Sequence, residues 1–201
     1  VALLLGSEII ISTLFGYGSF NEVAAQNSAA ALYYFALGLP AFSLIKIFSS
    51  FFFANYDTKT PFYISLVAVI LNIIISIYYF NEIGFIIIPI ATTISSWFNG
   101  ILLFLFLKKK NLFVFNNIFF IRFIKIIIAS LFMGIFFNYL LIYFQNKLTF
   151  DYNLKAFYLI VCVGLGLLSY LLVSLSIKAF KGLTEKFGVP MKTIFRVDCE
   201  T

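Results

Sequence analysis

The sequence predicts an all-α, polytopic membrane protein, and three observations lead to this class. Hydrophobic residues make up 63% of the 201 positions, and charged residues make up only 11%. A soluble domain carries about 25% charged residues, so this chain lacks the polar side chains that a water-exposed surface requires. The apolar residues also form long runs without the alternation that membrane β-strands show. The solvent around these runs is therefore lipid.

Five runs are long enough to cross a bilayer as helices, which takes about 20 mostly apolar residues. They cover residues 31–54, 62–80, 85–107, 118–144 and 155–177. A sixth run, 1–15, is too short for a span and begins abruptly, as though cut from a longer helix. We therefore expect about five full transmembrane helices plus one truncated N-terminal helix. The predicted domains are a transmembrane region, 1–177, and a tail, 178–201.

The basic residues predict how the chain is oriented. Because consecutive spans alternate in direction, segments 55–61, 108–125 and 178–201 fall on one side, where they carry eleven Lys and Arg residues against two in the opposite loops. Basic residues favour the cytoplasmic side of a membrane. The C-terminal tail is therefore predicted to be cytoplasmic. The net charge of +6 is explained by this asymmetry, and no nucleic-acid partner is predicted.

Side-chain composition argues against an enzyme. The chain contains no histidine, and its eight carboxylates form no paired constellation. A membrane-embedded acyl- or glycosyltransferase needs an acid or base group near the membrane surface. Cys162 and Cys199 match neither a disulfide framework nor a metal-ligand spacing. We therefore predict neither a catalytic residue nor a metal site built from these groups.

A polar interruption, "FFFANYDTKTPFYISLV", separates the first two long runs at residues 51–67. We interpret it as a short cytoplasmic turn in which Asp57 and Lys59 face water. The hydroxyl of Thr60 is expected to cap the following helix, with Pro61 at the first helical position.

The amino-acid sequence of this turn and of the helix before it resembles that of a known family. The stretch "YYFALGLPAFSLIKIFSSFFFANYDTKTP" resembles the tenth transmembrane helix and following loop of the lipid II flippase (MurJ/MviN) family, whose recurrent phrase is close to F-Y-A-x-x-D-T-K-T-P. The matching residues here are Asp57, Thr58, Lys59, Thr60 and Pro61. The flanking stretches "SEIIISTLFGYGSF" and "GFIIIPIATTISSWFNGILLFLFLKKK" resemble the end of the ninth helix and the twelfth helix. The resemblance extends through about residue 110, and two further apolar helices follow in the expected places.

The resemblance implies a function for the whole protein. Members of this family have fourteen helices, so this chain would be the C-terminal part, from late in helix nine. Its implied activity is to move a lipid-linked peptidoglycan precursor across the bacterial cytoplasmic (inner) membrane. The implied partners are membrane lipids, an undecaprenyl-linked substrate and the missing N-terminal lobe. That lobe carries the family's substrate-binding arginines, so no residue here takes that role.

Two alternative functions remain open from the sequence. Another exporter of the same superfamily, for polysaccharide-lipid or drugs, would share the helical architecture, although the Asp-Thr-Lys-Thr-Pro turn argues against it. A membrane assembly subunit without transport activity would also fit the composition.

Lys46 is the candidate cavity residue, because it is a basic residue within a predicted span. It precedes Phe53 by seven residues, so it lies about 10 Å from the helix end. Its long stem could snorkel towards the membrane surface over much of that distance. The resemblance favours the cavity, because the family's helix carries lysine at the matching place.

Prolines and small polar residues mark further candidates within the spans. Pro40 and Pro89 are expected to kink their helices, because each removes a backbone hydrogen bond.

Asn72, Ser76 and Thr92 fit either helix packing or a cation site. The resemblance implies a Na+ site near Asn72 and Thr92, although Ser76 stands where a carboxylate ligand is expected. Na+ or the membrane potential is therefore the candidate source of coupling, and no other cofactor is predicted. Ser95, Ser96 and Asn99 share the helix face of Thr92, so the same two interpretations apply to them. Helix packing is the default interpretation of the remaining stripes, which comprise Ser130, Gly134, Asn138, Gly164, Gly166 and Ser169.

Overall fold

The computed structural model describes residues 1–16, 22–110, 117–148 and 154–177. Within these ranges all regular secondary structure is helical, which confirms the predicted fold class. The elements, in chain order, are α1 (Ala2–Phe15), α2 (Glu22–Ala54), α3 (Lys59–Ile83), η1 (Gly84–Ile86), α4 (Ile87–Lys109), α5 (Asn117–Tyr143), η2 (Gln145–Lys147) and α6 (Lys155–Ser176). The predicted tail, 178–201, lies outside the described residues.

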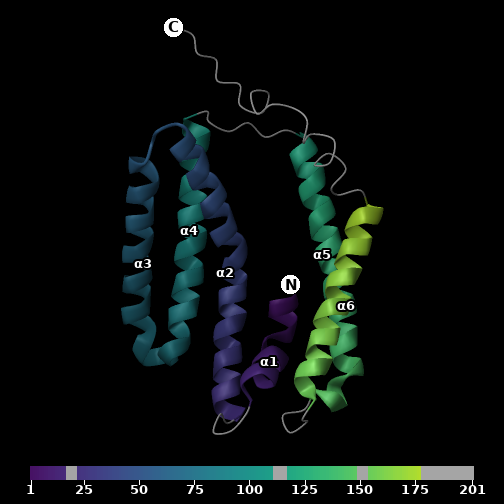
Figure 1. The fold of residues 1–201 in the computed structure, drawn as a ribbon. Coiled ribbons are helices and arrows are strands. Elements are labelled where there is room, and N and C mark those ends of the chain that lie inside the picture. Colours follow the sequence, from purple (N-terminus) through teal and green to yellow (C-terminus); the bar gives the residue numbers. More distant parts are fainter. Residues whose placement is uncertain (17–21, 111–116, 149–153, 178–201) are drawn as a thin grey trace.

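Among the described residues, four continuous helical runs are long and apolar enough to cross a membrane, and one of them folds back on itself. The run Lys59–Lys109 comprises α3, η1 and α4, and Figure 1 shows α3 and α4 side by side as an antiparallel pair. The reversal has a φ of 72° at Gly84. Glycine adopts this backbone conformation readily, whereas it is sterically costly for residues with a Cβ atom. The described chain therefore has five long helices and the short α1. This arrangement agrees with the sequence prediction.

Helix α2 is longer than its apolar run. It was expected to begin near residue 31, but it begins at Glu22. The added segment, "EVAAQNSAA", contains four alanines, and alanine is the strongest helix former. Hydropathy detects the part of a helix that faces lipid, whereas helix propensity extends α2 beyond that part.

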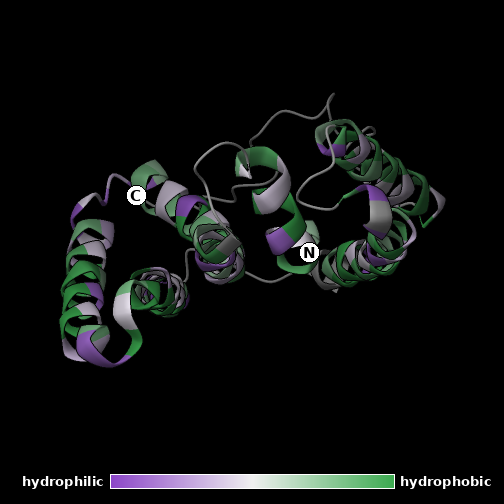
Figure 2. Ribbon diagram, turned by 90° about the horizontal axis from the view of Figure 1, so that it is seen from below, coloured by the Kyte–Doolittle hydropathy of each residue, from purple (hydrophilic) through white to green (hydrophobic). Residues whose placement is uncertain are grey.

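The long helices form two groups with separate cores (Figure 1). Phe48, Phe52, Ile64, Leu103 and Leu107 form the core of the α2–α3–α4 group. The core of the α5–α6 pair contains Phe137, Leu140, Leu141, Leu159 and Cys162. In Figure 2 most of the long helices are coloured as hydrophobic, as expected where lipid replaces water around the bundle.

Helix α1 links the two groups at one end of the molecule. Ile11 packs with Ala25 and Ala29 of α2, while Ala2, Ile9 and Ile10 pack against the α5–α6 core. Lys155, the first residue of α6, is 1% exposed, and its Nζ donates to the carbonyl oxygen of Gly16 at 2.7 Å. This carbonyl lies directly after the last residue of α1, where no further helical N–H follows it.

The ends of the long helices alternate as the sequence predicts. In Figure 1 the α2–α3 turn, the end of α4, the start of α5 and the end of α6 lie at one end of the molecule. Lys59, Lys108, Lys109 and Lys110 lie there as well, because they belong to these helix ends. The opposite end contains the α3–α4 and α5–α6 connections.

Close packing between α5 and α6 leads to a test with a matched control. A Cβ atom at Gly166 would lie 3.2 Å from Cδ2 of Phe137, whereas a Cβ atom at Gly164 would meet nothing within 4 Å. Overpacking a core costs roughly 1–3 kcal/mol. We therefore expect Gly166→Leu to lower the thermal unfolding temperature measured by circular dichroism in detergent. Gly164→Leu should leave it unchanged or higher, and equal losses in both variants would contradict this packing.

Candidate functional site

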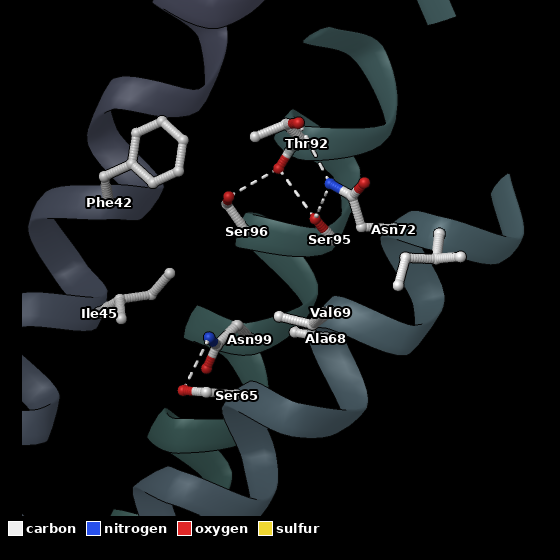
Figure 3. A pocket seen from close by; sticks show the side chains of 11 residues that line it. Phe42, Ile45, Ser65, Ala68, Val69, Asn72, Thr92, Ser95, Ser96 and Asn99 are labelled. Atoms are coloured by element: carbon white, nitrogen blue, oxygen red, sulfur yellow. Dashed lines mark hydrogen bonds between the residues drawn. The ribbon is translucent and has the colours of Figure 1, made fainter. Parts of the chain in front are cut away.

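A cavity of about 450 Å³, lined by both polar and apolar side chains, lies between α2, α3 and α4 (Figure 3). Helix α2 contributes two apolar side chains, Phe42 and Ile45. The polar lining comes from α3 and α4 and comprises Ser65, Asn72, Thr92, Ser95, Ser96 and Asn99. These residues recur one or two turns apart, so each helix presents them on one face. The cavity thus brings together two candidate cation-site residues, Asn72 and Thr92.

The first layer of polar contacts in this cavity joins α3 to α4 through Asn72. The Nδ2 amide of Asn72 donates to Oγ1 of Thr92 at 3.1 Å and to Oγ of Ser95 at 3.2 Å. Its Oδ1 accepts a bond from Oγ of Ser76 at 3.4 Å. The three candidate residues therefore belong to one hydrogen-bonded cluster, together with Ser95. Their predicted role as cation ligands stays a prediction.

A second layer lies two helical turns away, where Nδ2 of Asn99 donates to Oγ of Ser65 at 3.4 Å. Asn99 is only 8% exposed, and its Oδ1 has no hydrogen-bond partner among the described residues. Ser96 lies between the layers, and its hydroxyl donates to the carbonyl of Thr92 at 2.6 Å. Sequence reasoning grouped Asn99 with Thr92, Ser95 and Ser96 on one helix face, with packing as the default and a cation site as the alternative, and it did not single out Asn99. Its unpaired oxygen depends on the tertiary arrangement of α3 and α4.

Two side chains of α4 hold α2 against the cavity. Oγ1 of Thr93 donates to the carbonyl of Tyr34 at 2.7 Å, and Nε1 of Trp97 donates to that of Leu37 at 3.1 Å. Gly38 lies at this contact, where an added Cβ atom would be 3.0 Å from Oγ1 of Thr93. Sequence reasoning missed both donors. Their spacing of four residues, with a hydroxyl and an indole N–H, was the available signal.

The two prolines occupy different positions in their helices. Pro40 lies inside α2, and Figure 1 shows α2 changing direction about midway along its length. Pro89 is the third residue of α4, directly after η1. A proline in the first helical turn removes no intrahelical bond, because the N–H groups there have no partner within the helix. The kinks expected at these two residues stay predictions.

Lys46 lies on α2 away from the cavity between α2, α3 and α4. Its side chain is exposed, and Nζ makes no hydrogen bond or ion pair with the residues that the structure describes. Ser43 and Ser50 lie on the same side of the helix by spacing. Their hydroxyls bond to the helix's own carbonyls, at Leu39 and Lys46.

The α2–α3 turn is organised by Asp57, which differs from the expectation. Thr60 was predicted to cap α3 with Pro61 at the first helical position, but α3 begins at Lys59. Oδ1 of Asp57 accepts the backbone N–H of Thr60 at 3.0 Å, and Oδ2 accepts its hydroxyl at 2.7 Å. The two oxygens of the Asp57 carboxylate accept both bonds at once, and the Thr60 hydroxyl is a donor in this contact and does not cap the helix. The cap is therefore supplied by Asp57.

Asp57 also ties this turn to the end of α4. Nζ of Lys110 lies 2.5 Å from Oδ2 of Asp57, with the two side chains 44% and 20% exposed. The hydrogen bond from Lys110, followed by those from Thr60, holds the pKa of the Asp57 carboxyl well below its usual range. The charged form of Asp57 is therefore the one that this contact stabilises.

Comparison with known proteins shows to which family the chain belongs. The family model described as "Lipid II flippase MurJ" matches residues 1–161, which include α1 to α5 and the start of α6. The chain belongs to the lipid II flippase MurJ family. The match extends beyond residue 110, where the resemblance in the sequence was carried only by apolar helices.

Curated MurJ relatives are similar to different lengths of the chain. A probable lipid II flippase MurJ of Rickettsia prowazekii is 36% identical over 109 residues, which are 54% of this chain and 22% of that protein. The one of Borreliella burgdorferi is 26% identical over 177 residues, which are 87% of this chain and 34% of that protein. The one of Haemophilus influenzae is 28% identical over 165 residues, covering 80% and 31%. The chain therefore spans about a fifth to a third of these relatives' length.

The Asp57–Lys110 contact at the MurJ-family turn leads to a prediction about pH. Because folding lowers the pKa of Asp57, its contribution to stability is present above about pH 4 and is lost as the pH falls through the folded value. Asp57→Asn should remove that part of the pH dependence, and it should cost at most about 1 kcal/mol near neutral pH because the pair is partly exposed. Unfolding temperatures measured from pH 7 down to pH 2 test this expectation.

Two neighbouring lysines provide the control for this prediction. Lys110→Gln should reproduce the effect of Asp57→Asn, and combining the two should cost little more than either alone. Lys109→Gln, in which the adjacent exposed lysine is neutralised, should leave the pH profile unchanged. A profile altered equally by both lysine variants would contradict a specific Asp57–Lys110 pair.

Proposed function

We propose that this chain supplies the C-terminal helices of a flippase that moves the lipid-linked peptidoglycan precursor lipid II across the bacterial cytoplasmic membrane. The observation that carries the proposal is the match of the MurJ family model over residues 1–161 of a multi-pass helical chain. The remaining length of the relatives corresponds to the lobe that would complete the transporter. Transport of the lipid is then a property of the two parts together.

Lys46 is the residue of this chain that we assign to the substrate cavity. A charged lysine within a span costs about 2.5–3.5 kcal/mol on insertion scales, so it faces protein or water in most membrane proteins. Its side of α2 carries Ser43 and Ser50, and all three side chains are exposed. An ammonium group there suits the phosphate groups of a lipid-linked precursor, which are anionic.

The cluster around Asn72 is the cation site that we propose for coupling. Amide and hydroxyl oxygens suit a hard monovalent ion such as Na+. Asn72 would have to turn its amide so that Oδ1, instead of Nδ2, faces Thr92 and Ser95, and no carboxylate is present at Ser76. These residues therefore fit weak binding of a monovalent cation. When bound, the cation would add positive charge between α3 and α4.

The basic end of the bundle is proposed to be cytoplasmic. It carries Lys59 and Lys108 to Lys110, and Arg122 and Lys125 follow early in α5. Positive residues are retained on the cytoplasmic side during insertion, and each contributes about 1 kcal/mol of attraction to anionic headgroups. This orientation would place the Asp57 turn inside the cell and the α3–α4 connection outside.

Complementation of bacteria depleted of their own lipid II flippase tests the proposed activity. We expect rescue when the chain is fused behind the N-terminal lobe of a MurJ relative, and no rescue by the chain alone, because the substrate-binding arginines are expected in that lobe. Lys46→Gln in the same fusion should reduce rescue if the ammonium contacts substrate. A fusion that inserts in the membrane without any rescue would contradict the flippase assignment.

Cysteine labelling tests the proposed orientation. In a background without Cys162 and Cys199, we expect Asn81→Cys to react with a membrane-impermeant thiol reagent added to intact cells. Thr58→Cys should react only after the membrane is opened, because it lies in the turn at the basic end. The reverse labelling pattern would invert the topology and leave the fold unchanged.

A further inference from the structure

Asn99 lines the cavity with an oxygen that is not engaged in a hydrogen bond within the described structure. Its side chain is 8% exposed and lines the cavity, and Oδ1 has no donor among the described residues. A buried acceptor without a partner costs roughly 1–3 kcal/mol, and hydrocarbon offers no replacement. In this arrangement Oδ1 of Asn99 is open to a ligand that donates a hydrogen bond or carries positive charge.

In contrast to Asn99, Asn72 has an amide group whose oxygen and nitrogen are both already engaged in hydrogen bonds. Its Nδ2 already donates to Thr92 and Ser95, and its Oδ1 already accepts from Ser76. A cation arriving there would first have to displace these bonds. In the arrangement described here, the oxygen that is free to bind a ligand is therefore on Asn99 and not on Asn72.

The hydroxyls near Asn99 also present oxygen to the cavity. The proton of Ser96 is engaged by the carbonyl of Thr92 at 2.6 Å, which leaves the lone pairs of its Oγ available. Oγ of Ser65 accepts a bond from Asn99 and has a second lone pair. The lining residues have no formal charge, so the set suits a monovalent cation better than a divalent one, which usually takes carboxylate ligands.

The cavity is large enough for the ion to keep part of its water. Its volume is about 450 Å³, and a water molecule occupies about 30 Å³ in the liquid. The retained water would supply the ligands that two or three protein oxygens cannot. Figure 3 shows Asn99 and Ser65 at one end of this space and Asn72 with Thr92 at the other.

The positions of Ser65 and Asn99 along their helices show where this second polar layer lies in the bundle. Ser65 is six residues into α3, about 9 Å from its start, and Asn72 is about 20 Å from it. On α4, Asn99 is about 15 Å from the end at Lys109, whereas Thr92 is about 25 Å from it. The layer at Asn99 therefore lies between the basic end of the bundle and the cluster around Asn72.

We propose that Asn99, Ser65 and Ser96 form a second binding position for a partly hydrated monovalent cation, between the basic end of the bundle and the Asn72 cluster. This inference rests on the cation coupling proposed above. The ion would first bind the open Oδ1 of Asn99. It would then move about two helical turns to the Asn72 cluster when the amide of Asn72 rotates.

Sodium-dependent thermal stabilisation tests this position. The native protein that contains this chain would be purified in detergent and unfolded in Na+ or in N-methylglucamine at equal ionic strength. A ligand that binds only the folded state raises the unfolding temperature. We expect Na+ to stabilise the wild type and Asn72→Leu, and to have at least a several-fold smaller effect on Asn99→Leu.

A second variant covers the case in which Asn99→Leu does not fold. Asn99→Asp adds a carboxylate at the same position, so we expect the Na+ concentration for half-maximal stabilisation to fall about tenfold. Asn138→Leu, an exposed asparagine on α5 outside the cavity, is the matched control and should keep the wild-type response. An unchanged Na+ midpoint in Asn99→Asp would overturn the proposal.

The outcomes separate this inference from the functions proposed above. Full stabilisation of Asn99→Leu, with none of Asn72→Leu, would leave a single site at Asn72 and overturn the position at Asn99. No Na+ effect on any variant would overturn both cation positions, with water then the occupant next to Asn99. Neither result bears on rescue of flippase-depleted cells, which tests lipid transport by itself.

Discussion

Hydrocarbon offers no hydrogen bonds, and this constraint determines where the polar side chains of the bundle point. Most hydroxyls in the described helices donate their proton to a carbonyl of their own helix, as Ser12, Ser130 and Ser174 do. The hydroxyls of such residues are satisfied within hydrocarbon without a bond to a neighbouring helix. The side chains that bond between helices are the informative ones, because their position depends on the neighbouring helix as well.

Bonds between helices concentrate on α4. Its Thr93 and Trp97 donate to carbonyls of α2, its Thr92 and Ser95 accept from Asn72 of α3, and its Asn99 donates to Ser65. Helix α4 is therefore the centre of its group. A shift of α2 along α4 by one turn would break the first two bonds in an environment that cannot replace them. The close approach at Gly38 adds a steric limit, since an added Cβ atom would lie 3.0 Å from Thr93.

The sequence predicts what depends on hydropathy and leaves out what depends on distant contacts. Long apolar runs located five helices and the turn at Asp57, and the ends of α5 and α6 fell within one residue of the expected positions. The start of α2 was missed because an alanine-rich segment is helical without being strongly apolar. The Asp57–Lys110 pair joins residues 53 positions apart, and the Lys155–Gly16 bond joins residues 139 apart. No local pattern contains either contact, nor does any mark which oxygen of the cavity remains unpaired.

The separate cores of the two helix groups also bear on movement. Each core is formed within its own group, so a relative displacement of the groups leaves the packing around Phe52 and Phe137 intact. The cost of such a displacement falls on α1, which packs against both groups and whose terminal carbonyl, at Gly16, is bonded by Lys155. A displacement that separates α1 from α6 would remove this carbonyl from the buried ammonium of Lys155, and losing an acceptor is unfavourable for a buried charge. The α1–α6 contact therefore favours the described arrangement over one in which α1 and α6 separate.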